Sequence, residues 1–275
     1  MHNNNENIVI NGLWIGSKLS NVEMLCIHSY LKNGHSFVLW AYDAIENKLP
    51  DGVIVKDASE IIPREKVFSY KNTNQFGHGK GSYAGFSDIF RYNLLYEHGG
   101  WWTDMDVTCL KPFDFPEPYV FRTHHDLPMV GNIMKCPKGS ELMKQCFDEA
   151  SVQIDENNTD WHKPIQILND NIVKLGLSGY VLDFTNHDSW NYIRKLLIKN
   201  VDLPKEWYAV HWINEEWRRN KVDKNIFYKN STLGKLCRKY MPDKTDILAD
   251  FSIFKRFKFS YANATFKQIK SRLSG

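Results

Sequence analysis

The segment Ser87–Pro112, SDIFRYNLLYEHGGWWTDMDVTCLKP, constrains the fold of this chain more than any other stretch. Its first part places apolar side chains at helical spacing, which predicts an amphipathic helix. Gly99 and Gly100 should end that helix, because glycine adopts a left-handed C-terminal cap without steric cost. The β-prone run Trp101–Thr103 follows at once. The segment therefore predicts a helix, a glycine turn and a short strand in immediate succession.

Two aspartates, Asp104 and Asp106, follow this strand as a D-x-D triplet. Alternate residues of an extended chain point to the same side, so both carboxylates should face one spot. Carboxylate oxygens are ligands that suit Mg²⁺ or Mn²⁺, and these ions also bind phosphate oxygens. Isolated D-x-D triplets are more often solvated loop carboxylates. The triplet alone is therefore compatible with a metal site or with an exposed loop.

Asp88 and Arg91 lie one turn apart on the predicted helix, so they share a face. This face is opposite the apolar stripe, and Ser87 lies at its margin. An acid and an arginine in this position could form a surface ion pair. Beside a metal site, they could instead hold a sugar hydroxyl and a phosphate.

The start of the chain predicts a strand over residues 7–16, a helix over 20–32 and a second strand over 36–42. Short connections between such elements indicate a βαβ unit, and hence a parallel sheet with right-handed crossovers. Ligands in these sheets bind at the carboxyl ends of the strands, where Trp14 and Tyr42 lie. Taken alone, Trp14 is more often a core aromatic.

Composition indicates a globular protein, with 43% hydrophobic and 14% aromatic residues and a mean hydropathy of −0.46 among 275 residues. No apolar run approaches the ~20 residues that span a bilayer, and the N-terminus lacks the pattern of a signal peptide. The five cysteines form no C-x-x-C pair, which favours reduced thiols. These features predict a cytoplasmic location.

The order S-D-x-x-R, L-x-x-x-G-G, an aromatic residue and D-x-D resembles the sugar-binding region of glycosyltransferase family 32. That family includes bacterial capsule and lipopolysaccharide transferases, and the clostridial glucosylating toxins are more distant relatives. All the elements are present in order and at the expected spacing, which is more specific than D-x-D alone. The resemblance implies an α/β fold, namely a GT-A-like single domain whose mainly parallel central sheet is flanked by helices. It also implies a metal-dependent, retaining transferase.

The resemblance further assigns roles to residues of the central segment. Asp88 and Arg91 would contact the donor sugar, and Trp102 would line the nucleotide pocket. Asp104 and Asp106 would hold Mn²⁺ or Mg²⁺, with Asp106 binding it most directly.

Outside this segment, L-W-I-G around Trp14, before a strand ending in Y-D, is similar to the nucleotide-binding start of the toxin transferases. There the tryptophan stacks on uracil, which implies a UDP-sugar donor here. Asn132 lies in a strand that resembles an N-x-x-M element, and could contact the donor sugar or the acceptor. It could equally be a turn asparagine next to glycine. His124, His125 and Asp126 precede it and could lie on the acceptor side or in a surface loop.

His211 begins the run HWINEEWR, which resembles an H-x-x-x-x-S-W-like element that returns to the metal site late in the chain. It is therefore a candidate third metal ligand or pyrophosphate contact. Glu216 replaces the common serine, and Trp217 could pack over the diphosphate or the sugar. Taken alone, a histidine on an apolar strand is more often a satisfied core residue.

The expected site residues form three overlapping sets. The nucleotide-sugar-binding set is Trp14, Tyr42, Ser87, Asp88, Arg91, Trp102, Asn132 and Trp217, the catalytic set is Asp88, Arg91, Asp104 and Asp106, and the metal-binding set is Asp104, Asp106 and His211.

Residues 251–275 differ from the rest of the chain, because they hold six basic residues, no acidic residue and several interleaved aromatics. This pattern suits an anionic membrane face, although single-stranded nucleic acid or packing on the body would use similar chemistry. We predict a transferase domain over 1–250 and a tail that contacts the inner face of the cell membrane, and no nucleic-acid partner. The glycine-rich segment 76–85 lacks the order of a phosphate-binding loop and predicts a connector.

The function predicted from these features is transfer of a sugar to a glycan or lipid-linked glycan during surface polysaccharide synthesis. Two alternatives stay open. A non-catalytic nucleotide-sugar or glycan-binding protein could keep the same fold without turnover. A metal-dependent phosphoester hydrolase is a further possibility, but such enzymes usually cluster more acidic and histidine ligands than this sequence supplies near Asp104.

Overall fold

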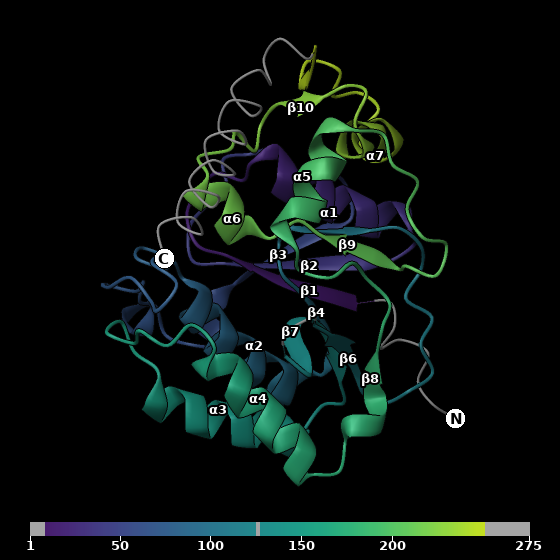
Figure 1. Cartoon of the computed structure of the whole chain (residues 1–275). Helices are drawn as coiled ribbons and strands as arrows, with labels where there is room; N and C mark the ends of the chain where they lie inside the picture. The colour runs from purple at the N-terminus through teal and green to yellow at the C-terminus, as the bar shows by residue number, and fades with distance from the viewer. Residues whose placement is uncertain (1–8, 125–126, 251–275) are drawn as a thin grey trace, which may run out of the picture. The chain divides into compact units, whose positions relative to one another are not determined.

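The structure is a computed structural model that describes residues 9–124 and 127–250 (Figure 1). The predicted basic tail, as well as His125 and Asp126, lies outside these described residues. The described chain forms two compact units. The first comprises the residues up to Asp188 together with Pro204–Glu215. The second comprises Ser189–Leu203 and the residues from Glu216 onward. The predicted division of the chain after residue 250 stays a prediction.

The first unit contains a seven-stranded sheet of order β3-β2-β1-β4-β7-β6-β8. Its strands are β1 (Val9–Trp14), β2 (Ser36–Ala41), β3 (Val53–Asp57), β4 (Gly100–Thr103), β6 (Val120–Thr123), β7 (Met129–Cys136) and β8 (Val181–Leu182). Strands β3, β2, β1 and β4 are all parallel, whereas β7 runs antiparallel to both β4 and β6. The predicted α/β fold with a mainly parallel central sheet is thereby confirmed.

Helices flank this sheet on both faces, as Figure 1 shows for α1 on one side and α2, α3 and α4 on the other. They are α1 (Asn21–Lys32), α2 (Ala84–His98), α3 (Glu141–Gln153) and α4 (Lys163–Lys174), with short 3₁₀ turns at Ala58–Glu60, Arg64–Lys66 and Ser178–Tyr180. The first unit also holds the antiparallel pair β5 (Val107–Cys109) and β9 (Ala209–His211). The remaining elements are α5 (Trp190–Ile198), α6 (Asn214–Arg219), α7 (Thr232–Tyr240), β10 (Phe227–Tyr228) and β11 (Leu248–Ala249).

The adjacent tryptophans of β4 explain why both faces of the sheet are covered. Trp101 and Trp102 are both fully buried and, as neighbours in a strand, point to opposite faces. The Trp101 ring contacts Phe113, which packs on the side of α1, while the Trp102 ring contacts Phe90 of α2. Two large aromatic side chains thus anchor the strand from both sides and hold the residues that follow it in place.

The strand order reverses beside the D-x-D triplet. The chain runs outward from β1 through β2 to β3, and then returns to β4 on the other side of β1. The register pairs Asn11 with Trp102, so the carboxyl ends of β1 and β4 lie at the same edge. Ligands of open α/β sheets bind at such a reversal of strand order. Asp104 and Asp106 follow β4 directly at this edge.

The boundaries of α2 differ slightly from the sequence prediction. The helix begins at Ala84, three residues before Ser87, with the Ala84 N–H donating to the Ser82 hydroxyl. It ends at His98, as expected, and Gly99 has a positive φ of +68°, but its ψ of −164° lies outside the left-handed cap that was predicted. A Cβ on Gly99 would lie 2.5 Å from the backbone nitrogen of Lys138, so glycine is also required by close packing.

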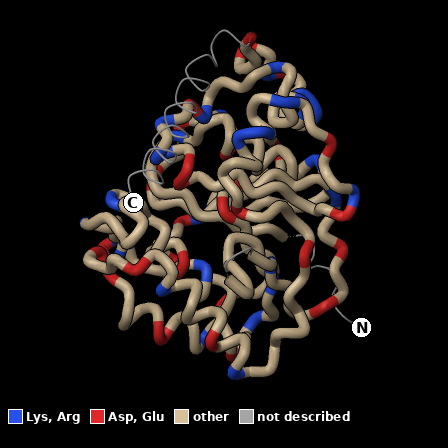
Figure 2. Tube along the Cα trace, in the orientation of Figure 1, with Lys and Arg blue, Asp and Glu red and all other residues tan. Residues whose placement is uncertain are grey.

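Three features of the described residues concern the predictions about cysteine chemistry, charge and membrane spans. None of the five cysteines, all of which lie in the described residues, forms a disulfide. Figure 2 shows acidic and basic residues interspersed along the described trace. Within residues 9–124 and 127–250, every helix is too short or too polar to cross a membrane.

Candidate active site

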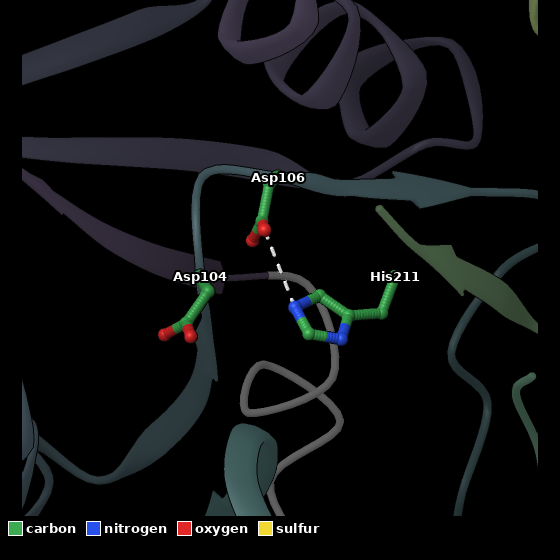
Figure 3. Close-up of side chains that lie close together, drawn as sticks. All are labelled: Asp104, Asp106 and His211. Carbon is green, nitrogen blue, oxygen red and sulfur yellow. Dashed lines mark ion pairs between the residues drawn. The ribbon is translucent and has the colours of Figure 1, made fainter. Parts of the chain in front are cut away.

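Asp104, Asp106 and His211 come together at the carboxyl edge of β4 (Figure 3). One ligand atom from each side chain lies within 4.8 Å of the others. Pairing of β5 with β9 causes this convergence, because it aligns Val107 with His211. The structure thus places the predicted third ligand beside the D-x-D triplet, although the two segments are more than 100 residues apart.

Asp106 is held rigidly and is almost completely buried. Its Oδ2 lies 3.2 Å from His211 Nε2 and accepts a hydrogen bond from the Asn214 N–H. Its backbone carbonyl accepts a hydrogen bond of 2.9 Å from the Trp212 N–H. These contacts exclude the exposed-loop interpretation for Asp106. The run that begins at His211 is therefore attached to the D-x-D triplet through three separate interactions.

Asp104 is the more accessible member of the pair, with 29% of its side chain exposed. Its Oδ1 accepts hydrogen bonds from Trp102 Nε1 at 2.8 Å and from Arg91 Nη2 at 3.0 Å. Its backbone N–H donates to the Asn132 carbonyl at 2.8 Å. The carboxylate is thus oriented by one strand neighbour and by one residue of the preceding helix.

Arg91 bridges the buried Asp88 and the partly exposed Asp104. Its Nη2 lies 3.1 Å from Asp88 Oδ1 and 3.0 Å from Asp104 Oδ1, and both Arg91 and Asp88 are buried. The surface ion-pair interpretation of these two residues is therefore wrong. The guanidinium also lies over the Trp102 ring, 5.2 Å from its centroid. A Cβ at Gly131 would approach Arg91 Nη1 to 2.8 Å, so a larger residue there would displace the guanidinium.

Burial and neighbouring charges shift the pKa of each of these groups in opposite directions. Burial raises the pKa of Asp88 to about 6, against the opposing effect of Arg91. Burial likewise raises the pKa of Asp104, although Arg91 again favours the charged form. Burial would lower the pKa of His211, but Asp188 and Asp106 outweigh it and raise the value to about 10. Without a metal ion, the imidazole is therefore cationic at neutral pH.

The shifted pKa of Asp88 predicts a pH-dependent stability. The folded carboxyl keeps its proton up to about pH 6, whereas in the unfolded chain it releases it near the ordinary value of 3.8. Between these values the folded state binds more protons, so the free energy of unfolding falls as pH rises, by up to about 3 kcal/mol. Asp88→Asn, which does not titrate, should lack this component.

Urea denaturation in metal-free buffer, at about pH 4 and about pH 7, measures the effect on wild type and variant. Asp51→Asn, at an exposed turn, serves as the control and should keep the wild-type dependence. If wild type and Asp88→Asn lose stability equally over this interval, the assignment of a raised Asp88 pKa is wrong.

Three residues around His211 were not among those predicted from the sequence. Asp188 Oδ1 lies 2.7 Å from His211 Nδ1, and Arg122 Nη2 lies 2.6 Å from the same carboxylate oxygen. The Asn186 side chain exchanges two hydrogen bonds with the His211 backbone, at 2.7 and 3.0 Å. The one signal in the sequence was Arg122, a charged residue within an apolar strand. Burial would raise the pKa of Asp188, but His211 and Arg122 outweigh it and keep that pKa well below the usual range.

A cavity of about 310 Å³ lies at the carboxyl ends of β1 and β2. It is lined by Ile15, Gly16, Tyr42, Asp43, Arg64, Val67 and Tyr83. Arg64 donates to Asp43 Oδ1 at 2.7 Å, and Asp43 Oδ2 accepts from the Gly16 N–H at 3.0 Å. This cavity shares the carboxyl edge of the sheet with the D-x-D triplet and contains the predicted residue Tyr42.

Two aromatic residues that were predicted to bind the nucleotide, Trp14 and Trp102, lie near the cavity and near the D-x-D triplet, respectively. Trp14 is partly buried at the end of β1, where its Nε1 donates to the Lys18 carbonyl at 3.0 Å, and it precedes the cavity residue Ile15. Trp102 lies in the core, and its Nε1 supports Asp104. The contacts of both residues with a nucleotide stay predictions.

The other predicted binding residues differ in their surroundings. Asn132 is buried, and its side-chain oxygen accepts from Arg122 Nη1 at 3.1 Å. Ser87 is partly buried in the first turn of α2. Trp217 is buried and belongs to the second unit. Their roles in binding the donor stay predictions.

The glycine-rich segment leads into α2 through turns rather than from a strand. Gly77, Gly79 and Gly81 have φ values of +75°, +99° and +77°, which explains the repeated glycines. The Gly79 N–H donates to Glu215 Oε1 at 3.1 Å, and His78 Nδ1 lies 3.7 Å from the same oxygen. The segment is thereby linked to the residue that follows Asn214, one of the partners of Asp106.

Residues 20–121 match the family described as "Glycosyltransferase sugar-binding region containing DXD motif". The matched residues include Asp88, Arg91, Asp104 and Asp106, and make up less than half of the chain. The chain contains a DXD glycosyltransferase region. This finding confirms the resemblance drawn from the motifs and the prediction that the protein is a transferase. His211 and Asp188 lie outside the matched region.

Two solved structures show a weak likeness to this transferase. One, titled "PaToxG Glycosyltransferase", is 16% identical, with 61% of this chain and 68% of that chain covered and a TM-score of 0.44. The other, described as the structure of a transferase mutant with two substituted cysteines, is 9% identical, with coverages of 67% and 93% and a TM-score of 0.42. Both scores are too low for these likenesses to carry an inference. No curated protein matched the sequence.

Proposed function

We propose that this chain is a metal-dependent, retaining glycosyltransferase that moves a sugar from a UDP-sugar to a glycan or lipid-linked glycan acceptor. The observation that carries the proposal is the convergence of Asp104, Asp106 and His211 at the carboxyl edge of β4, with Arg91 and Asp88 behind them. Surface polysaccharide synthesis is the process that we infer, on the resemblance stated above. A cytoplasmic location and membrane contact through residues 251–275 belong to the same proposal.

The three converging side chains fit a divalent cation. Two carboxylates and one imidazole, with ligand atoms within 4.8 Å of one another, have a spacing close to the ~4 Å span of a coordination sphere with bonds of ~2.1 Å. A nitrogen ligand favours Mn²⁺ over Mg²⁺, which prefers oxygen. When bound, the ion would neutralise the charge that develops on the leaving nucleoside diphosphate. His211 must lose its proton to act as a ligand.

The donor can be placed along the carboxyl edge of the sheet. The cavity formed by Tyr42, Asp43 and Arg64 would hold the uracil and ribose, with Trp14 beside it. The diphosphate would then reach Asp104 and Asp106 across the end of β1. This order follows the general preference of α/β proteins for binding nucleotides at the reversal of strand order.

The buried arginine and its partner acid would act on the sugar end of the donor. Arg91 offers a fixed positive charge that needs little reorganisation during the reaction, because Asp104, Asp88 and the Trp102 ring already hold it. Asp88 would accept hydrogen bonds from sugar hydroxyls and thereby orient the anomeric carbon. Asn132 would contact the donor sugar or the acceptor.

Front-face substitution accounts for retention without a covalent intermediate. The acceptor oxygen would bond to the anomeric carbon on the face that the diphosphate leaves, and the acceptor proton would pass to a leaving phosphate oxygen. No dedicated base is needed in this scheme. A phosphoester hydrolase would instead cleave a nucleotide sugar rapidly without an acceptor, and a binding protein would not cleave it at all.

A panel of UDP-, GDP- and dTDP-sugars tests the proposal on the full chain. One UDP-sugar should raise the melting temperature with Mn²⁺ and not with EDTA, and should release UDP slowly, since bound ligand stabilises the native state. Arg64→Gln should weaken binding of this UDP-sugar about tenfold, because it removes the charge-assisted contact of Arg64 with Asp43 in the cavity. Lys66→Gln, on the same short turn but outside the cavity, should leave binding unchanged.

Failure of every nucleotide sugar to stabilise the chain would contradict the proposed donor class. Rapid release of UDP that no glycan acceptor accelerates would favour the hydrolase instead. Stabilisation without any cleavage would favour the binding protein.

A further inference from the structure

We infer that Asp188, itself locked by Arg122, is the positioning residue of the metal site, and that it turns the His211 ring so that Nε2 faces the ion. The inference rests on the metal dependence proposed above. It goes further by assigning roles to Asp188, Asn186 and the whole Arg122 network, none of which belongs to the D-x-D motif or to the region that matches the family.

The two nitrogens of His211 face different acids. Nδ1 lies 2.7 Å from Asp188 Oδ1, and Nε2 lies 3.2 Å from Asp106 Oδ2. Both nitrogens face carboxylates, which accept hydrogen bonds, but the contact of Nδ1 is the shorter one, so the neutral ring keeps its proton on Nδ1, facing Asp188. In the neutral ring this leaves the lone pair on Nε2, beside Asp106, where a metal ion would bind. The second partner of a ligating histidine sets its tautomer and its orientation in this way.

Arg122 fixes the carboxylate of Asp188 through two parallel contacts. Its Nη2 lies 2.6 Å from Oδ1 and its Nη1 lies 2.9 Å from Oδ2, which is the bidentate arrangement that restricts a carboxylate most strongly. The Arg122 side chain is completely buried. A register shift between Phe121 and Arg122 breaks the regular pairing of β6 with β7, and such irregularities re-aim a side chain.

The remaining contacts of Arg122 extend this support to both halves of the site. Arg122 donates to the Thr185 hydroxyl and to the Asn186 carbonyl, which orders the segment that carries Asp188. It also donates to the Asn132 side-chain oxygen at 3.1 Å, and the Asn132 carbonyl accepts from the Asp104 N–H. One buried guanidinium therefore connects to His211 through Asp188 and to Asp104 through Asn132.

The backbone of His211 is held by the same segment. Asn186 Oδ1 accepts from the His211 N–H at 2.7 Å, and Asn186 Nδ2 donates to the His211 carbonyl at 3.0 Å. With Asn186 on the backbone and Asp188 on the ring, His211 cannot turn away from Asp106 without breaking several buried hydrogen bonds. Asp188 acts through His211 and is not assigned a contact with the ion.

Asp188→Asn tests the inference through metal affinity rather than turnover. An amide can present its NH₂ to Nδ1, which would move the ring proton to Nε2 and block the ligand atom. The Kd for Mn²⁺, measured on the full chain by the electron paramagnetic resonance of free Mn²⁺, should rise about 10- to 100-fold. His211→Ala should weaken Mn²⁺ binding at least as much.

Lys135→Met is a matched control for the loss of a buried charged contact. Lys135 lies on neighbouring strand β7 and donates to the Phe115 and Glu117 carbonyls, so its replacement should destabilise the fold and leave the Kd for Mn²⁺ unchanged. Equal loss of Mn²⁺ affinity in Lys135→Met and Asp188→Asn would overturn the positioning role. Wild-type affinity in Asp188→Asn would overturn it as well.

A measurement on the wild type does not depend on the variant folding. With Cd²⁺, a diamagnetic ion, bound to the full chain, ¹⁵N NMR should show His211 protonated at Nδ1 and coordinated through Nε2. Coordination through Nδ1 would contradict the inference while leaving the metal site intact. Absence of any Mn²⁺ or Cd²⁺ binding would refute the proposed metal dependence, and the inference with it.

Discussion

Asp106→Asn should abolish metal-dependent release of UDP from the donor sugar, with a loss of about 10³-fold or more. The substitution keeps the shape of the side chain and can still accept from the Asn214 N–H, so the fold should persist. It removes the negative charge that would bind the cation and that faces His211 Nε2 at 3.2 Å. Mn²⁺ should then no longer raise the melting temperature in the presence of the UDP-sugar.

The control for this experiment is Asp148→Asn. Asp148 lies on the exposed face of α3 and pairs with Lys144, so the same change of charge there should alter neither UDP release nor metal binding. Should Asp106→Asn retain Mn²⁺-dependent cleavage within about tenfold of wild type, the metal-site assignment would be wrong. The binding-protein alternative would gain support if neither variant nor wild type released UDP.

Arg91→Met should cause a large loss of stability. It leaves the buried Asp88 and the partly exposed Asp104 without the cation that lies 3.1 and 3.0 Å from their oxygens. Removing one partner of a buried ion pair costs about 3–5 kcal/mol of the free energy of unfolding. Urea denaturation near neutral pH should show this loss, and transfer activity should fall by about 10²-fold or more, because a fixed charge is lost.

A second substitution separates the charge effect from general damage to the core. Asp88→Asn combined with Arg91→Met removes one of the two stranded acids, so part of the lost stability should return. Arg219→Met is the matched control, since Arg219, with half of its side chain exposed, pairs with Glu216 at the same spacing and should contribute less than about 1 kcal/mol. If Arg91→Met lowers the free energy of unfolding no more than Arg219→Met does, Arg91 does not stabilise the site as we describe.

The local part of the site could be predicted closely from the sequence. Helical periodicity, the glycine stop and the β-prone tryptophans placed α2, β4 and the D-x-D triplet in the correct order, because each signal depends only on neighbouring residues. The start of α2 was missed by three residues, since the N-terminal turn is set by Ser82 and Tyr83 rather than by the apolar stripe. The burial of Asp88 and Arg91 was not predictable, because it arises from distant elements such as α3, α4 and β7 that pack around α2.

The contacts that hold His211 in place could not be predicted from the sequence. Arg122 and Asp188 are 66 residues apart, and Asp188 and His211 are a further 23 apart, so no local pattern connects them. Asp188 follows a short stretch of polar residues that resembles an ordinary loop. Only the pairing of β6 with β8 and of β5 with β9 brings these segments to Asp106.

The sequence by itself determined the α/β class, the D-x-D triplet and the kind of chemistry that two adjacent carboxylates can support. These depend on hydrophobic periodicity, on glycine conformations and on the identity of ligand atoms, all of which are properties of residues close together in the chain. The tertiary structure alone decided that the buried Arg91 pairs with both Asp88 and Asp104 and that Asp188 holds His211. The reason is physical: desolvation and hydrogen-bond geometry act on residues that meet in space, and long-range strand pairing determines which residues meet.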